Sequence, residues 1–167
     1  MTRAAQPLVT AAACAPRNRR PHVARLLALL LCAALWTIAG PALAANPTLH
    51  FHKAYVNSPG SDTGSNTSRN AEYVVISNSS YSGSYRLTGY TLRDRSGHVY
   101  KFPTFTLRPR ASVTVHTGRG TNTSTNLYWG SGAYIWNNTG DTAYLRNTVG
   151  TLKDSCSWGS VSSYVYC

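Results

Sequence analysis

The sequence is poor in acidic side chains. Only five of its 167 residues are Asp or Glu, against sixteen Lys and Arg. A glycosidase needs two facing carboxylates, and so few acids leave little from which to build such a pair. The sequence also contains neither a nucleophile elbow nor a glycine-rich phosphate loop. These shortages make a cryptic hydrolase or metal-dependent enzyme the weakest functional hypothesis.

The chain has no apolar run long enough to span a membrane comfortably. Its longest run, Leu26 to Ile38, has roughly thirteen residues, whereas a membrane-spanning helix needs about 20. A basic stretch precedes the run, and Gly40-Pro41 and the small-residue site Ala42-Leu43-Ala44 follow it. This order predicts a secretory signal peptide over residues 1–44, cleaved after Ala44. A retained membrane anchor is the alternative.

Cysteine becomes scarce once the signal is removed, because only Cys156 and Cys167 remain. Two cysteines in an exported chain predict one disulfide, and two free thiols are the alternative. The mature segment, residues 45–167, is long enough for one domain with its own core. It retains eleven of the sixteen basic residues, six more than the acids.

Helical periodicity is missing after Ala45, since no segment repeats apolar residues every 3.6 positions. Runs of Val, Ile, Tyr and Thr alternate instead with Gly, Asn and Ser, which is typical of short strands joined by turns. Nine strands are expected: Leu49–Val56, Ala71–Asn78, Arg86–Asp94, Val99–Phe102, Ser112–Thr117, Leu127–Trp136, Thr142–Asn147, Thr151–Trp158 and Ser163–Cys167. Such a pattern predicts an all-β sandwich or barrel.

Side-chain alternation indicates which strand faces are buried. Val74 and Ile76 should point inward, and so should Val113 and Val115. The apolar residues around Gly89 are out of step by one, which predicts a β-bulge within a continuous strand. Two long polar segments, Asn57–Asn70 and Gly118–Asn126, are expected to be loops, mobile rather than functional on composition alone.

Several phrases occur in an order that resembles a known family. They are Glu72-Tyr73-Val74-Val75-Ile76-Ser77-Asn78, Leu87-Thr88-Gly89-Tyr90-Thr91-Leu92, Phe102-Pro103, Leu107-Arg108-Pro109, Val113-Thr114-Val115-His116-Thr117-Gly118, Trp136-Asn137, and Gly140-Asp141-Thr142-Ala143-Tyr144-Leu145 with Gly150 and Asp154. Together they resemble the lamin tail domain in its bacterial secreted form. The resemblance implies an immunoglobulin-like Greek-key β-sandwich used for interaction, with no catalytic residues and no cofactor. Arg110 stands where that family often has glycine.

The titratable residues of the mature chain are interpreted as structural. Asp94, Asp141 and Asp154 lie at expected strand ends or turns, where Asp commonly bonds the backbone. Glu72, at the start of a strand, is expected to have a structural role rather than an acid–base role. His50 and His52 share a strand face and could ligate a metal with a third ligand. The sequence supplies no such ligand, so no metal site is predicted.

Basic residues gather between Arg86 and Arg119, opposed there only by Asp94. If the turns of this segment project on one side, they form a patch suited to phosphate-rich polymers. The candidate ligand-binding residues are Arg93, Arg95, Lys101, Arg108, Arg110 and Arg119. An ordinary solvated surface is the alternative. Trp129, Trp136 and Trp158 are expected in the core rather than on a carbohydrate or nucleobase platform.

The sequence therefore predicts a secreted, extracellular, non-catalytic binding or structural module with no cofactor and an unknown protein or cell-envelope partner. Its mature chain is expected to have no membrane span. The first alternative is a binder of anionic polymers, either extracellular nucleic acid or a phosphate-bearing wall polymer.

The signal peptide leads to the first testable prediction. The exported protein should have an intact mass that corresponds to a chain beginning at Ala45, because signal peptidase cuts after the small-residue site. Mass spectrometry of the secreted protein measures this directly. A mass that still includes Leu26 to Ile38 would contradict the prediction.

Overall fold

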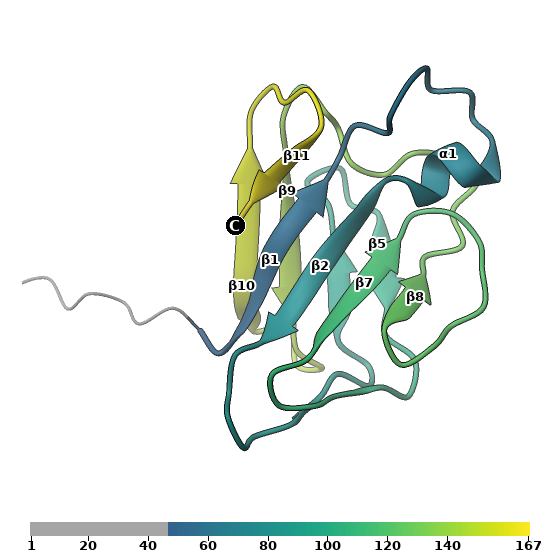
Figure 1. The fold of residues 1–167 in the computed structure, drawn as a ribbon. Coiled ribbons are helices and arrows are strands. Elements are labelled where there is room, and N and C mark those ends of the chain that lie inside the picture. Colours follow the sequence, from purple (N-terminus) through teal and green to yellow (C-terminus); the bar gives the residue numbers. More distant parts are fainter. Residues whose placement is uncertain (1–46) are drawn as a thin grey trace, which may run out of the picture. The chain divides into compact units, whose positions relative to one another are not determined.

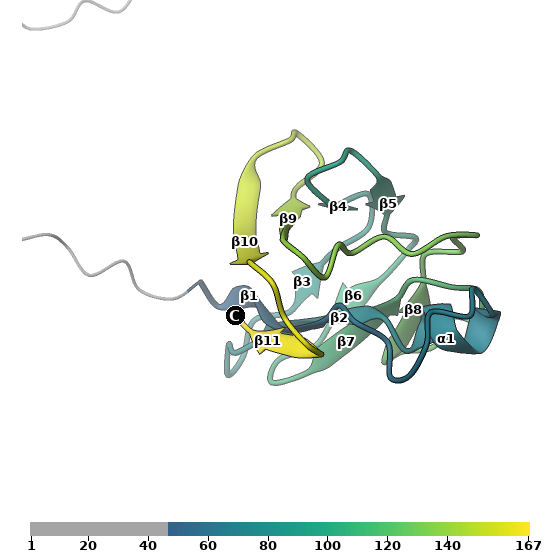
Figure 2. The ribbon, with the colours of Figure 1, turned by 90° about the horizontal axis from the view of Figure 1, so that it is seen from above.

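The computed structural model describes residues 47–167, which form two packed β-sheets with a smaller sheet beside them (Figures 1 and 2). The expected signal peptide lies outside the described residues, so its cleavage stays a prediction. The five-stranded sheet has the order β11-β1-β2-β7-β8, the four-stranded sheet β10-β9-β4-β5, and the small sheet β3-β6. The expected all-β, immunoglobulin-like sandwich is confirmed.

The eleven strands of the described part are short. Their bounds are β1 Leu49–Tyr55, β2 Tyr73–Asn78, β3 Tyr85–Arg86, β4 Thr91–Arg93, β5 Val99–Lys101, β6 Thr106–Leu107, β7 Ser112–His116, β8 Asn126–Tyr128, β9 Asp141–Arg146, β10 Leu152–Trp158 and β11 Tyr164–Tyr166. A single short helix, α1, spans Asn66–Asn70 in this part of the chain. All strand pairs are antiparallel except β7 with β8.

The core lies between the inner faces of the two larger sheets. Val74 and Ile76 on β2 are fully buried, and Val113 and Val115 on β7 are buried opposite them in the ladder, so the predicted inward faces are confirmed. Trp136 and Trp158 are buried and meet edge to face, with centroids 5.8 Å apart. Burial of such large rings provides much of the apolar area that stabilises a domain of this size.

The predicted strand Arg86–Asp94 is broken rather than bulged. Gly89 has a positive φ of 78°, and the amide of Tyr90 donates to the carbonyl of Leu87, which closes a turn. The chain therefore forms two strands, β3 and β4, where the sequence indicated one. Leu87 and Leu92 are still buried, because the turn restores the phase of the apolar residues.

The predicted strand Leu127–Trp136 is also wrong over most of its length. Only Asn126–Tyr128 forms a strand, β8, and the rest is irregular. The amides of Ile135 and Trp136 do not join a ladder, because both donate to the side chain of Glu72. Period-two alternation alone could not reveal that these amides bind a distant carboxylate.

The first predicted loop contains helix α1, so that part of the prediction is corrected. Ser65 caps the helix, since its hydroxyl accepts a hydrogen bond from the amide of Ser68 at 3.1 Å. The amide groups of Asn66 and Asn70 both donate to the carbonyl of Arg119. These contacts hold the first polar segment against the second.

Two further findings concern the C-terminal part and membrane spans. The sulfur atoms of Cys156 and Cys167 lie 1.99 Å apart, at disulfide distance, as the sequence predicted. The pair joins β10 of one sheet to the residue that follows β11 of the other. Within residues 47–167, no helix is long and apolar enough to cross a membrane.

Candidate binding faces

Glu72 lies just before β2 and is completely buried. Its Oε2 atom accepts hydrogen bonds from the hydroxyl of Thr117 at 2.5 Å and from the amide of Ile135 at 3.0 Å, and its Oε1 accepts from the amide of Trp136 at 3.0 Å. Burial raises the pKa of Glu72 to about 7, although the three hydrogen bonds oppose this shift. The carboxyl group therefore joins β2, the end of β7 and the irregular segment before β9, which matches the structural role expected for it.

Three aspartates also bind backbone amides. Asp94 Oδ1 accepts from the amides of Gly97 and His98, both at 2.7 Å, and closes the β4–β5 hairpin. Asp141 accepts from the amides of Arg95, Asn137 and Thr142 at the start of β9. Asp154, inside β10, accepts from the amide of Phe51 at 2.6 Å and so connects the two sheets. The predicted backbone-bonding role of these residues is confirmed, but the expected place of Asp154 at a strand end or turn is wrong, because it lies inside β10.

These hydrogen bonds leave the surface almost without carboxylates. Of the five acids, only Asp62 is exposed. Within residues 47–167, the one contact at ion-pair distance joins His98 and Asp94, at 2.6 Å, and no Lys or Arg takes part in such a pair. The same part of the chain contains no group of three or more His, Cys, Asp or Glu arranged to hold a metal ion. The described surface therefore carries several exposed cations and one exposed carboxylate.

Three exposed cations and the half-buried Arg146, whose guanidinium donates to the carbonyl of Gly150, share the outer face of the four-stranded sheet. Leu92, Tyr100 and Leu145 point inward, so their neighbours Arg93, Lys101 and Arg146 point outward. We call the outer surface formed by Arg93, Arg95, Lys101 and Arg146 the basic face.

The strand register brings the members of the basic face together. Thr91 on β4 pairs with Lys101 on one side and with Arg146 on the other. Arg93 lies two residues further along the same strand, and Arg95 reaches back to the hydroxyl of Thr142 at 3.5 Å. Arg93 itself pairs with Val99 and Tyr144, so Lys101 and Arg146 are its diagonal neighbours, about 7–8 Å away.

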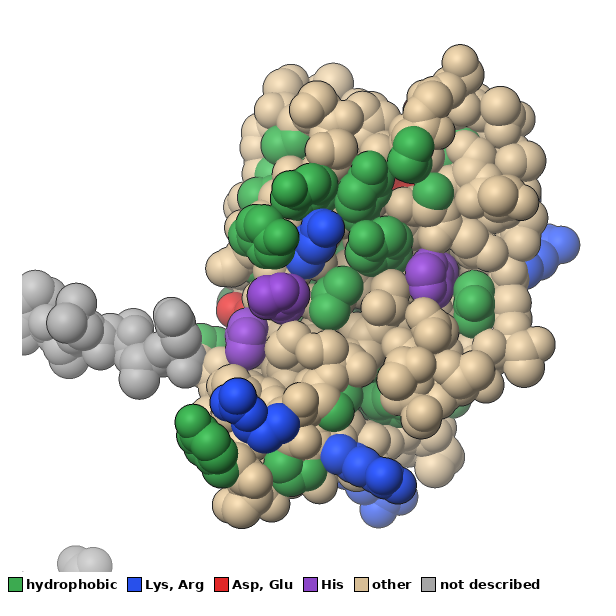
Figure 3. Space-filling model, in the orientation of Figure 1, with side chains coloured by type: hydrophobic (Ala, Val, Ile, Leu, Met, Phe, Trp, Pro, Cys, Tyr) green, Lys and Arg blue, Asp and Glu red, His purple; other side chains and the backbone are tan. Residues whose placement is uncertain are grey.

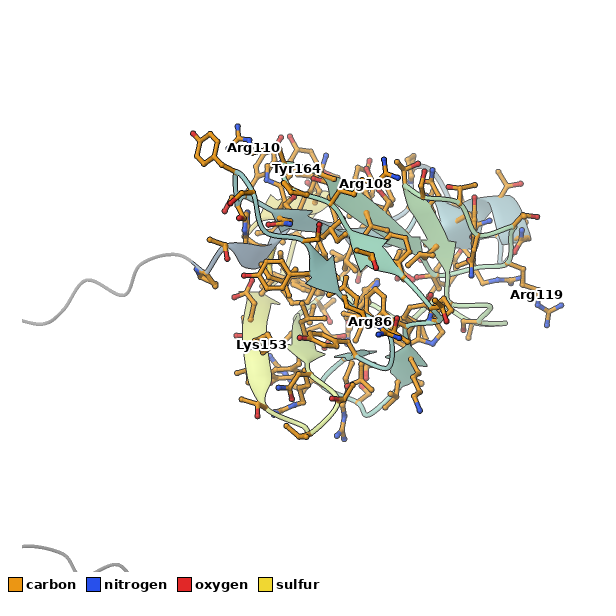
Figure 4. The ribbon with its side chains drawn as sticks, turned by 90° about the horizontal axis from the view of Figure 1, so that it is seen from below. Arg86, Arg108, Arg110, Arg119, Lys153 and Tyr164 are labelled. Atoms are coloured by element: carbon orange, nitrogen blue, oxygen red, sulfur yellow. A yellow bond between two sulfur atoms is a disulfide. The ribbon has the colours of Figure 1, made fainter. Side chains whose placement is uncertain are left out.

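The other predicted binding residues lie elsewhere. Arg108 and Arg110 are in the connection between β6 and β7, and Arg119 is in the connection between β7 and β8. Figure 4 shows Arg119 at the opposite end of the domain from Arg110. The structure therefore brings together three of the six predicted residues, Arg93, Arg95 and Lys101, and separates the remaining three from them.

Arg146 was missed because it is forty-five residues beyond Lys101 in the sequence. Its place beside Thr91 depends on the pairing of β4 with β9. A search of the sequence for clustered charge finds only residues that are close to one another along the chain, so it could not group Arg146 with Lys101. The alternation Ala143-Tyr144-Leu145-Arg146 was the available signal, because it predicts an outward side chain for Arg146 once the neighbouring strand is known.

The family model for the Lamin Tail Domain matches residues 43–160. The chain belongs to the lamin tail domain family. None of the curated proteins matches the chain.

The lamin tail match includes most strands of both large sheets but ends before β11. The last strand therefore lies beyond the matched region, joined to it by the pair Cys156 and Cys167. Arg110, where lamin tail domains often have glycine, has a positive φ of 58°. This conformation is uncommon for a residue with a side chain, and it explains why glycine suits the position.

The raised pKa of Glu72 leads to a prediction about pH. Because the pKa of the folded state lies above the usual value of 4.5, the folded protein takes up a proton between about pH 4.5 and 7. This contribution to stability is complete below pH 4.5 and is lost as pH rises through 7. The free energy of unfolding of the parent, relative to Glu72→Gln, should therefore fall between pH 5 and pH 8, by at most about 3 kcal/mol.

Urea unfolding at both pH values measures this difference. Asp62→Asn is the comparison variant, because the charge of this exposed acid is the smallest of the causes that raise the pKa of Glu72. Its replacement should lower that pKa slightly and keep most of the parental pH dependence. A parent that becomes more stable than Glu72→Gln as pH rises would show that the hydrogen bonds outweigh burial and keep the carboxylate ionised.

Proposed function

We propose that this lamin tail domain is a non-catalytic binding module that works outside the cell, and that its basic face binds anionic polymers. The observation that carries the proposal is the separation of charge. Four of the five acids bond backbone amides, while Arg93, Lys101 and Arg146 point outward on one sheet face with no directly paired carboxylate. The signal-like leader and the cysteine pair support an extracellular location.

The basic face suits a repeating anion better than a small ligand. Like charges within about one Debye length, roughly 8 Å at physiological salt, repel one another and attract counterions. A polyphosphate chain that binds several of these residues releases its own condensed counterions. Extended sheet surfaces also lack the concave shape of small-molecule sites. Extracellular nucleic acid and phosphate-bearing wall polymers share this chemistry.

The positions of the acidic side chains argue against an enzymatic role. General acid–base catalysis requires a carboxyl or imidazole group within reach of a substrate. Glu72, Asp94 and Asp141 are buried and already accept hydrogen bonds from the backbone. Moving any of them toward a substrate would leave buried amides without an acceptor, at a cost of about 1–3 kcal/mol each.

Two triple variants test the basic face. Arg93→Ser, Arg95→Ser and Lys101→Ser together remove three positive charges from it. Arg108→Ser, Arg110→Asn and Arg119→Ser remove the same number elsewhere, and Asn is chosen at 110 because it tolerates a positive φ. Both variants should keep their fold, since exposed substitutions change stability by about 0.5 kcal/mol or less.

Binding of duplex DNA at several salt concentrations measures the effect. The logarithm of the parental affinity should fall with the logarithm of salt at a slope of about −3 to −4, for four phosphates neutralised. The first variant should lose most of this slope, and the second should retain it. Equal losses in both variants would show that binding follows net charge alone, and the basic face would then not be a site.

A further inference from the structure

The outer face of the five-stranded sheet carries at least one aromatic ring on each strand. Strand pairing aligns one ring of each strand in a continuous row, and we call this set the aromatic row: Tyr164 on β11, Tyr55 on β1, Tyr73 on β2, His116 on β7 and Tyr128 on β8. Tyr166 and His52 lie beside the end of the row at β11 and β1. Neighbouring ring centroids lie 5.8, 5.4, 5.6 and 5.1 Å apart in that order. Figure 3 shows this surface, with hydrophobic side chains gathered around a Lys and with His among them.

The rings of the row are held in place by their surroundings. Three of the four neighbouring pairs are stacked, with interplanar angles of 20–26°. The Nδ1 of His116 lies 2.8 Å from the carbonyl oxygen of Asn70, and its Nε2 lies 3.0 Å from the side-chain amide of Asn126. Tyr128 packs so closely on Gly120 that a Cβ there would lie 2.4 Å from the ring. A ligand would therefore meet ordered rings and would cost little side-chain entropy on binding.

The row is not needed for the hydrophobic core. Its members are half-buried or exposed, and Tyr164 is 43 % exposed. In residues 47–167, the tyrosine hydroxyls that make hydrogen bonds belong to Tyr85 and Tyr134, which lie outside the row. The four tyrosine hydroxyls of the row are thus available to a ligand, while their rings provide apolar surface.

The charge of this face differs from that of the basic face. No Asp or Glu occupies an outward position on its strands, and its one Lys or Arg is Lys53. The ammonium group of Lys53 lies 4.0 Å from the centroid of Tyr164 and 5.5 Å from that of Tyr55, so aromatic rings already surround it. A nearly neutral face matches a ligand without net charge.

We propose that the aromatic row binds a neutral polysaccharide. A sugar ring has an apolar C–H face that packs on aromatic rings and a rim of hydroxyl groups that bonds phenol hydroxyls. The hydroxyl of Thr114 points outward in the next row of the sheet and offers a further hydrogen bond, whereas the side chain of Asn126 beside it is already bonded to His116 and Thr125. Strands are spaced by about 4.8 Å, so the row extends about 19 Å, long enough for several sugar units.

Single-stranded nucleic acid fits this face less well. Its bases could stack on the rings, but each phosphate needs a cation along the path of the backbone. The outward positions supply only Lys53. Binding at the aromatic row should accordingly be insensitive to salt, which separates this proposal from the one made for the basic face.

Affinity electrophoresis of the full chain tests the proposal, in gels that contain hydroxyethylcellulose, xylan, galactomannan or β-1,3-glucan. Tyr164→Ala removes an exposed ring from an edge strand and should weaken binding by about tenfold. Tyr55→Phe removes only a hydroxyl and should weaken it by about fivefold, the effect of one hydrogen bond. Tyr81→Ala is the matched control, because Tyr81 is 86 % exposed but lies outside the row.

The expected result is retardation by at least one of these polysaccharides that changes less than twofold between about 50 and 500 mM salt and is kept by Tyr81→Ala. Retardation by none of them would overturn the proposal. An equal loss in Tyr81→Ala would also overturn it. Two further results would overturn it if no polysaccharide binds. One is retention on poly(dT) that is lost in Tyr164→Ala, and the other is a concentration-dependent dimer that is lost in the same variant.

Discussion

The buried carboxyl group of Glu72 is the interaction on which much of this sandwich depends. The segment before β9 cannot join a sheet, yet its amides at Ile135 and Trp136 are buried and need acceptors. Glu72 supplies both, although burial of its carboxyl group opposes ionisation. Trp136 is thereby held in the core beside Trp158. Asp94, Asp141 and Asp154 act in the same way at three other points of the fold.

This use of acids determines the chemistry of the surface. Because four of the five carboxylates bond backbone amides, no Lys or Arg of residues 47–167 forms an ion pair with an acid. The two outer faces of the sandwich differ in the side chains at their outward strand positions. Arginine and lysine occupy outward positions of β4, β5 and β9, whereas tyrosine and histidine occupy those of the five-stranded sheet. The proposed ligands differ accordingly, an anionic polymer on one face and a neutral one on the other.

Local patterns predicted what depends on neighbours in the sequence. Alternation identified the buried faces of β2 and β7, and Asp94 was expected at a strand end or turn, where it closes the β4–β5 hairpin. Features that depend on distant pairing were not predicted. The break at Gly89 and the irregular chain before Trp136 come from bonds made elsewhere in the fold. The place of Arg146 in the basic face and the alignment of the aromatic row likewise depend on the strand register, which cannot be read from one sequence.

Hydrogen exchange of the amides of Ile135 and Trp136 tests most directly whether Glu72 holds the irregular segment in place. If it does, both amides should exchange in the parent as slowly as those of Val74 and Val115, although they lie in irregular chain. In Glu72→Gln, which has one side-chain oxygen in place of two, protection of at least one of them should fall while the two valines stay protected. Rapid exchange of Ile135 and Trp136 in the parent would contradict this role of Glu72.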